Sequence, residues 1–164
     1  VNLQEVPRVA TRATSKTPVA FTNVSKEELK KQNFGQDIPF LLSMTPSALT
    51  TSDAGAGIGY TTLRVRGTDG TRINITANGI PMNDAESHTL FWVNMPDFAP
   101  PVQDIQVQRG AGTSTNGAVA FGARVNSQSV GISHPPYAEF NASHSRLIAT
   151  HDTEHYGTGL LDRL

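Results

Sequence analysis

The stretch TTLRVRGTDGTRINITANGIPMND, residues 61–84, constrains the fold most strongly because it combines strand periodicity with closely spaced turn signals. Apolar and polar residues alternate in two runs, with Gly67, Asp69-Gly70 and Asn78-Gly79 between and after them. This pattern predicts two short strands joined as a hairpin. The polar side carries three arginines that no acidic residue within the strands answers: Arg64, Arg66 and Arg72. Their partners are therefore expected on another surface.

Composition describes a chain that is polar without being charged. Its 164 residues suit one domain of ordinary size. Apolar residues make up 37% and charged residues 16%, against roughly 45–50% (glycine included) and about 25% in typical globular domains. A disordered tail would need a high net charge. The composition instead favours a loop-rich domain whose surface is covered by something else.

Charge and residue usage exclude several classes of partner and site. The net charge is −1, from 13 basic and 14 acidic residues, which argues against nucleic acid and anionic membrane surfaces as partners. Cysteine is absent, which excludes disulfides and thiolate metal sites in this chain. No apolar run approaches the roughly 20 residues of a membrane helix. The chain begins with Val and carries no signal peptide, so we expect a mature or trimmed segment.

The first third of the chain predicts one edge strand and two short helices. Residues 1–24 are extended in character, with a strand expected near Val19–Phe21. Ser25 and Glu28 form a capping-box pattern, and Gly35 is a good helix stop. A second helix is expected over DIPFLLSMTP, residues 37–46, with Asp37 as its N-cap.

The remainder predicts strands separated by long loops. Residues 50–60 and 111–122 are glycine-rich loops, and the segment 83–101 is irregular. Strands are expected over 102–109, where Ile105 and Val107 alternate with glutamines, and over 123–129. Alternation returns from Tyr137 onward. The fold class is therefore α+β, with a small four-stranded mixed sheet, two short helices and long loops.

Candidate catalytic and cofactor motifs do not hold up. Glycines at 55, 57 and 59 lie after a helix and before a strand, the reverse of the order in a dinucleotide-binding motif. His151 and His155 lie about 13 Å apart if the segment is a strand, too far for one metal. Asp84, Glu86 and His88 lack a nucleophile or an oxyanion loop. We expect no cofactor, no metal and no enzymatic activity.

The arginines carry the most specific signal. Arg66-Gly67 follows one predicted strand and Arg109-Gly110 ends another, which places both guanidinium groups at a strand end, aimed outward. Arginine forms forked pairs with carboxylates and suits interfaces better than lysine. The alternative is that both arginines simply face solvent, which we would favour if the sequence held only one Arg-Gly pair at a strand end.

Two segments carry a family resemblance, LRVRGTDGTRINITANGIPMND and MPDFAPPVQDIQVQRGAGTSTNGAVAFGARVN. Their motifs resemble, in order and spacing, the plug domain of TonB-dependent outer-membrane receptors, in the variant found in Bacteroidota, over about residues 15–130. In that family a small α/β plug sits inside a barrel of about 22 strands. The receptor imports scarce nutrients with energy from the TonB complex. Three features depart from the family pattern: Val119, Arg124 and Pro100-Pro101.

The resemblance implies roles for particular residues. Arg66 and Arg109 match arginines that pair with glutamates on the inner barrel wall. Substrate contacts are implied in the loops 52–60 and 83–92, at Asp53, Gly57, Tyr60, Asn83, Glu86, His88 and Trp92, although a residue such as Trp92 is more often part of the core than a ligand contact. A TonB-contact segment is expected around Leu3, Glu5 and Val6, where Pro7 removes one backbone donor from any added strand.

The resemblance also implies an organisation and a setting. We expect a lead-in over 1–15, a plug over 16–132 and the first, truncated strands of a transmembrane β-barrel over 133–164. The implied location is the outer membrane of a Gram-negative bacterium, with a periplasmic N-terminus. The implied partners are the enclosing barrel, TonB, a surface lipoprotein and a small-molecule nutrient of the ferric siderophore, haem or cobalamin class. Two alternatives stay open: a non-transporting plug that blocks another chain's channel, and a secreted glycan-binding β domain.

Overall fold

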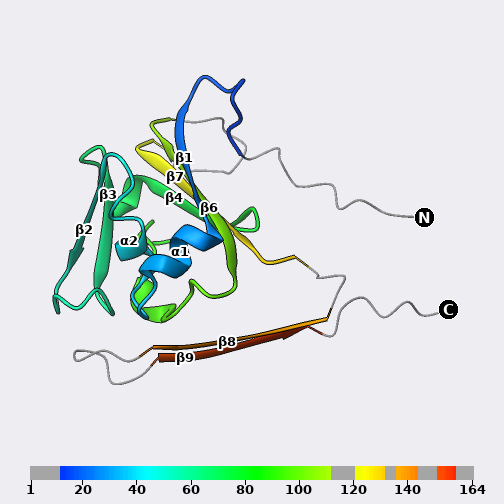
Figure 1. Ribbon diagram of the computed structural model, residues 1–164. Helices are drawn as coiled ribbons and strands as arrows, with labels where there is room; N and C mark the ends of the chain where they lie inside the picture. The colour runs from blue at the N-terminus through cyan, green and yellow to red at the C-terminus, as the bar shows by residue number, and fades with distance from the viewer. Residues whose placement is uncertain (1–11, 112–120, 132–135, 144–150, 158–164) are drawn as a thin grey trace.

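The computed structural model describes residues 12–111, 121–131, 136–143 and 151–157 (Figure 1). Its helical elements are α1 (Lys26–Gln32), α2 (Ile38–Leu41) and the 3₁₀ turns η2 (Gly70–Arg72) and η3 (Trp92–Asn94). Its strands are β1 (Ala20–Ser25), β2 (Ala48–Ser52), β3 (Thr61–Val65), β4 (Ile73–Ala77), β5 (Ile80–Pro81), β6 (Val102–Arg109), β7 (Ala123–Ser129), β8 (Tyr137–Ser143) and β9 (His151–Gly157). Neither helix in these ranges has the length and apolar character of a membrane-spanning helix.

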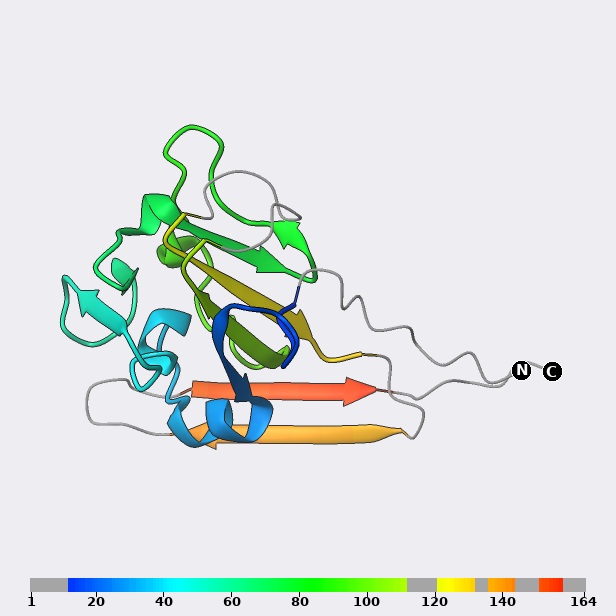
Figure 2. The same ribbon diagram turned by 90° about the horizontal axis from the view of Figure 1, so that it is seen from above.

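A five-stranded mixed sheet in the order β1-β6-β7-β4-β5 forms the centre of the fold. The β4–β7 pair is parallel and the other pairs are antiparallel. Two further pairs stand apart from it, β2–β3 and β8–β9. Figures 1 and 2 show α1 next to the β8–β9 hairpin, with the central sheet on its other side. The mixed α/β architecture expected from the sequence is thereby confirmed.

One face of the central sheet is apolar and supplies the hydrophobic core. Ile105 and Val107 lie on this face, and the row through Val107 continues it to Val125 of β7 and Ile75 of β4. Side chains from the helices, from β3 and from η3 pack against it. The core members from these elements are Leu29, Ile38, Leu41, Leu63, Val65 and Trp92. Burying each large aliphatic side chain contributes on the order of 1.5–3 kcal/mol.

The opposite face of the same sheet is polar and is also buried. Gln106 and Gln108 lie on it, beside Asn126 and Arg124 of β7 in register. All four side chains are no more than 4% exposed. Burial lowers the pKa of the Arg124 guanidinium. The alternation of glutamines with Ile105 and Val107 was predicted from the sequence, but the burial of the glutamines was not.

The entry into α1 confirms the predicted capping box. The Ser25 backbone N–H donates to Glu28 Oε2 over 2.8 Å, and the Glu28 N–H donates back to Ser25 Oγ over 3.4 Å. The hydrogen bond from the Ser25 backbone lowers the pKa of the Glu28 carboxyl. This contribution to stability is therefore present above the usual pKa of a glutamate and is lost as the pH falls through the lowered value.

Five sequence expectations were wrong in detail. The runs at 61–65 and 73–77 do not form a hairpin, because β3 pairs with β2 and β4 joins the central sheet. The glycine-rich loop is accordingly shorter than expected, and residues 48–52 form β2. The second helix ends at Leu41, and Asp37 does not cap it with its side chain. Instead Asp37 Oδ2 accepts a 2.7 Å hydrogen bond from Thr61 Oγ1, which ties α2 to β3. The central sheet has five strands rather than four.

A close packing of two turns closes one end of the sheet. The Gly110 N–H donates to the Gly122 carbonyl over 2.8 Å, and the Gly122 N–H donates to the Arg72 carbonyl over 2.9 Å. A Cβ placed on Gly122 would lie 2.2 Å from Thr68 Oγ1 and 2.7 Å from Thr68 Cβ. No side chain fits at position 122 unless the turn after β3 moves.

Replacing Gly122 by Ala is therefore expected to destabilise the chain by about 1–3 kcal/mol, the usual cost of overpacking. Denaturant unfolding followed by the fluorescence of Trp92, the single tryptophan of the chain, measures it. Gly79→Ala separates the two possible costs, because Gly79 has nothing within 4 Å of an added Cβ, so that any loss there comes from its φ of +81° and not from a clash. The clash is refuted if Gly122→Ala unfolds at the wild-type midpoint.

Candidate functional site

The two arginine–glycine pairs meet at one edge of the fold. Arg66 follows β3 directly, and Arg109 is the last residue of β6. A Cβ on Gly110 would lie 3.1 Å from Arg66 Nη1, so the Arg66 guanidinium lies against the backbone after β6. We call Arg66, Arg109 and the adjoining Pro46-Ser47 the arginine edge.

A strained backbone holds Arg66 in place. Arg66 has φ +53° and Ser47 has φ +66°, both in the left-handed region that non-glycine residues rarely adopt. The Arg66 N–H donates to the Ser47 carbonyl over 3.0 Å. Such outliers persist where the surrounding structure enforces them, and they cluster at functional sites. The backbone strain therefore supports a functional role for this corner, as the two Arg-Gly pairs in the sequence do.

Arg109 is half-buried and is partly held by its own domain. Its Nη1 donates to Thr22 Oγ1 over 2.6 Å. Two longer contacts of 3.5 Å reach the carbonyls of Pro46 and Phe21. One strong neutral hydrogen bond leaves most of the five N–H donors of a guanidinium available. Arg109 thus has a fixed position and remaining capacity for an acceptor.

Within the part of the chain that the structure describes, neither Arg66 nor Arg109 forms an ion pair with a carboxylate. Arg66 is exposed. Two cations fixed at one edge without an acidic neighbour repel each other and favour an anionic surface brought to them. The arrangement can bind carboxylates of another segment or molecule by forked hydrogen bonds.

A small groove lies between β3 and the end of the loop 83–92, one of the two loops predicted to face the substrate. It is lined by Thr61 and Thr62 of β3 on one side and by Thr89, Leu90 and Trp92 on the other. Its volume is about 70 Å³, whereas sites for drug-sized ligands measure about 300–1,000 Å³. The groove alone cannot enclose a large nutrient.

The seven predicted loop residues differ in how far their side chains are exposed. Four are exposed and available for contacts: Asp53, Tyr60, Glu86 and His88. Gly57 is buried, because a Cβ there would lie 2.9 Å from the Phe40 ring. Trp92 is only 4% exposed and belongs to the core, with one side lining the groove. The structure therefore favours Trp92 as a core residue over Trp92 as an exposed substrate contact.

Asn83 positions the loop rather than displaying a side chain. Its Oδ1 accepts from the Ile75 N–H over 2.8 Å, and its Nδ2 donates to the Ile73 carbonyl over 2.9 Å. The amide thus continues the pairing along the edge of β4 beyond β5. Nδ2 also donates to the His88 carbonyl over 3.0 Å.

Asp84 closes the turn that follows. Its Oδ2 accepts from the N–H groups of Glu86 and Ser87, over 3.1 and 2.7 Å, and from Ser87 Oγ over 2.9 Å. The hydrogen bond from the Ser87 backbone lowers the pKa of the Asp84 carboxyl. The turn therefore stays closed above the usual pKa of an aspartate and loosens as the pH falls through the lowered value. This built loop presents Glu86 and His88 to the outside.

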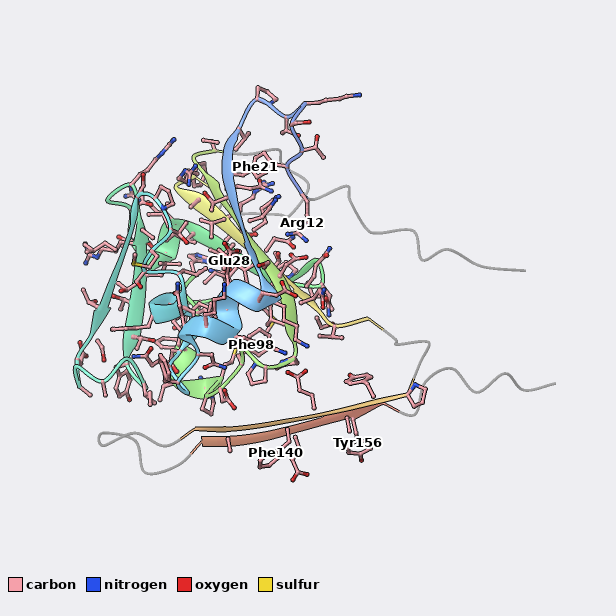
Figure 3. All side chains as sticks on the ribbon, in the orientation of Figure 1. Arg12, Phe21, Glu28, Phe98, Phe140 and Tyr156 are labelled. Carbon is pink, nitrogen blue, oxygen red and sulfur yellow. The ribbon has the colours of Figure 1, made fainter. Side chains whose placement is uncertain are left out.

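The β8–β9 hairpin contacts α1 through charges. Glu139 of β8 pairs with Lys26 Nζ at 3.4 Å and with Lys30 Nζ. The two lysines are four residues apart and so share one face of α1. Figure 3 shows Phe140 and Tyr156 on the side of the hairpin away from α1, where they are 65% and 81% exposed. Glu139 therefore faces the domain, whereas Phe140 and Tyr156 face away from it, on the side that also carries Glu154, the registered partner of Phe140.

Several of these residues escaped the sequence reasoning. The lysine pair carried a signal, an i,i+4 spacing on a predicted helix, but nothing pointed to Glu139 as its partner. No sequence signal pointed to the threonines that line the groove, Thr61, Thr62 and Thr89. Leu3, Glu5 and Val6, the predicted TonB-contact residues, lie outside the described residues.

Comparison with known proteins places this geometry in a family. The family model for the TonB-dependent Receptor Plug Domain matches residues 13–123. A search of curated proteins finds no match. Among solved structures, the ferric yersiniabactin uptake receptor FyuA from Yersinia pestis aligns with a TM-score of 0.57 and 18% identity, over 79% of this chain and 20% of that one.

Two further structures show the same fold. The siderophore receptor PirA from Acinetobacter baumannii has a TM-score of 0.59 and 21% identity, over 73% of this chain and 18% of that one. The copper transporter OprC has a TM-score of 0.56 and 17% identity, over 74% and 19%. The chain thus spans about a fifth of the length of these proteins, and at such identity the likeness concerns the fold alone.

Removing the Asn83 amide should loosen the loop without unfolding the domain. In Asn83→Ala, three hydrogen bonds are lost, so Trp92 at the end of the loop is expected to become more accessible to acrylamide quenching. Glu86→Ala is the control, since its side chain is exposed in the same loop. Equal quenching in wild type, Asn83→Ala and the control would show that Asn83 does not organise the loop.

Proposed function

Because the chain belongs to the family of TonB-dependent receptor plug domains, we propose that it gates the energy-coupled uptake of a scarce nutrient across an outer membrane. The observation that carries the proposal is the arginine edge. Two fixed cations at one corner of a plug-like domain, without acidic partners among the described residues, suit the carboxylates of an enclosing wall. By family resemblance that wall is the barrel of the same receptor.

The exposed apolar side chains support an enclosing wall as well. Met44 is 80% exposed and Phe121 is 79% exposed. Met44 lies two residues before Pro46 of the arginine edge, and Phe121 precedes Gly122, whose carbonyl accepts from the N–H of Gly110 next to Arg109. Monomeric soluble domains rarely leave such side chains open together around a functional corner. The lysine pair on α1 adds a contact with a strand that lies just beyond the plug. These features support a domain whose surface rests on a surrounding wall.

The proposed mechanism uses the mixed character of this interface. TonB would engage the N-terminal segment, with Leu3, Glu5 and Val6 as its contact, and pull from the periplasm. The plug would then shift or partly unfold and open a polar path. Polar contacts with a wetted wall exchange for contacts with water at little net cost, since hydrogen bonds are worth only about 0.5–1.5 kcal/mol net. The domain can therefore yield at its edge without losing its core.

We propose the loops 52–60 and 83–92 as the part of the plug that meets the nutrient. Asp53, Tyr60, Glu86 and His88 supply charge, a phenol and an imidazole at exposed positions. The groove beside the loop 83–92 is too small to hold a nutrient, so the barrel would complete the site. The substrate class we propose is a ferric siderophore, haem or cobalamin. A surface lipoprotein that delivers the nutrient would be a further partner.

Replacing both Arg66 and Arg109 by Ala is expected to loosen the seat of the plug. In native outer membranes, the double variant should release or expose its plug at a lower urea concentration than wild type, detected by protease cleavage within residues 12–131. Arg64→Ala is the control, because Arg64 is exposed on β3 but lies before the corner. An unchanged urea midpoint would exclude the wall-binding role of the arginines.

Reversing the charge of Glu139 tests the second contact. Glu139→Lys places three positive charges together, so the plug should become more sensitive to protease in membranes at low ionic strength, where charges are least screened. Adding Lys26→Glu and Lys30→Glu should restore resistance by exchanging the charges. Failure of the triple variant to recover would mean that Glu139 acts through something other than this pair.

Nutrient-dependent growth of a strain that carries these variants tests the function itself. Uptake that depends on both this protein and TonB supports the proposal. A protein that assembles in the outer membrane but supports no uptake of any nutrient supports the non-transporting plug instead.

A further inference from the structure

The side chain of Gln106 holds the backbone of the N-terminal segment. Its Oε1 accepts from the Ala13 N–H over 2.7 Å, and its Nε2 donates to the Ala13 carbonyl over 3.0 Å. One amide thus pairs with both main-chain groups of one residue, as a neighbouring strand would. Ala13 is 6% exposed and Gln106 is 2% exposed, so both hydrogen bonds are shielded from water.

Neighbouring side chains fix the orientation of this amide. Gln106 Nε2 also donates to Asn23 Oδ1 over 2.8 Å, and Gln108 Nε2 donates to Gln106 Oε1 over 2.8 Å. Both donors and both acceptor positions of Gln106 are therefore used. A buried amide with every position filled has one orientation, so the pairing with Ala13 is built in rather than accidental.

Arg12 fastens the same segment to two strands. Its Nη2 forms an ion pair with Asp104 Oδ1 of β6, and its Nη1 donates to Gln128 Oε1 of β7 over 2.8 Å. Figure 3 shows Arg12 beside the central sheet. We call Arg12, Ala13, Asp104, Gln106 and Gln128 the N-terminal clamp. Because Gln106 contacts only main-chain atoms of its partner, the clamp recognises an extended backbone.

The path of the chain makes the clamp a mechanical junction. Ala13 lies level with Asn23, which is registered with Gln106. The segment between them rises past the end of β1 and turns back into it, as the blue trace in Figure 1 shows. A pull on the N-terminus therefore reaches the clamp before it reaches β1.

The strand behind the clamp is easily detached. Among the strands that the structure describes, β1 lies at the edge of the sheet and pairs only with β6. If the clamp were absent, the pull would act on Ala20, at the start of β1, and draw it back along the strand. In that geometry the hydrogen-bonded pairs between β1 and β6 break one at a time, whereas the contacts of the clamp resist the pull simultaneously.

We propose that the N-terminal clamp is a load-bearing binding site for the extended chain at residues 12–13, and that it protects β1 from detachment until it opens. The proposal rests on the proposed function, since it assumes a pull on the N-terminus. Opening the clamp uncovers Gln106 and Asn23 on the polar face of the central sheet. It thereby turns a sustained pull into a stepwise release.

Force spectroscopy on the protein in native outer-membrane patches, with the N-terminus attached to the probe, tests the clamp. Wild type should show a first rupture followed by a lengthening of about 2 nm, as residues 13–19 straighten at roughly 3.3–3.6 Å each. In Gln106→Leu this first event should be lost, and β1 should detach at lower force. Gln103→Leu makes the same change at an exposed position of β6 and should behave as wild type.

A milder variant covers the case in which Gln106→Leu fails to fold. Arg12→Ala leaves Gln106 intact and should lower the force of the first rupture without abolishing it. In Gln106→Leu, amide exchange offers an independent reading, since loss of the hydrogen bond from the Ala13 N–H, worth about 1.4 kcal/mol, should speed exchange at Ala13 about tenfold. A first event of unchanged force and length in both variants would overturn the clamp.

The probe replaces any cellular partner, so this outcome does not depend on energy-coupled uptake. If the clamp fails while TonB-dependent growth persists, only the clamp is wrong. If the clamp ruptures as described but no uptake occurs, the proposed function is wrong and the clamp remains a property of the fold.

Discussion

The two-faced central sheet is the constraint on which the rest of the structure depends. One face builds the hydrophobic core with the helices, β3 and η3. The other buries amide and guanidinium groups, whose desolvation is tolerable only if they are hydrogen-bonded. The N-terminal segment at Ala13 supplies part of that bonding. A sheet with a buried polar face is also suited to yield, because its contacts on that side exchange with water more readily than apolar packing does.

The sequence predicts best where the physics is local. The capping box at Ser25 and Glu28 depends on four adjacent residues, and it is present. The alternation in β6 assigns Ile105 and Val107 to one face, and the structure agrees. The arginine–glycine pairs could be placed at strand ends from sequence, but their meeting at one corner could not, because it depends on how β3 and β6 lie relative to each other.

The sequence predictions that were wrong concern residues whose partners lie far away along the chain. The segments 61–65 and 73–77 carry a hairpin pattern, yet β3 pairs with β2 across the glycine-rich loop, since pairing partners are chosen by the whole core. Asp37 looks like a cap, yet its carboxylate bonds Thr61, 24 residues away. Burial raises the pKa of the Asp37 carboxyl, and the hydrogen bond from Thr61 lowers it by a smaller amount. Gln106 and Glu139 gave no signal, because their partners, Ala13 and the lysines of α1, are distant in sequence.

In the proposed function, this domain is seated within an enclosing wall that meets the arginine edge. Hydroxyl-radical footprinting of the protein in intact outer membranes tests this most directly, with Met44 and Phe121 beside the edge as reporters and half-buried Met82 as the internal reference. Oxidation of both reporters at or below the level of Met82 is the predicted result. Oxidation at the rate of freely accessible side chains, in a protein that is correctly assembled, would contradict it.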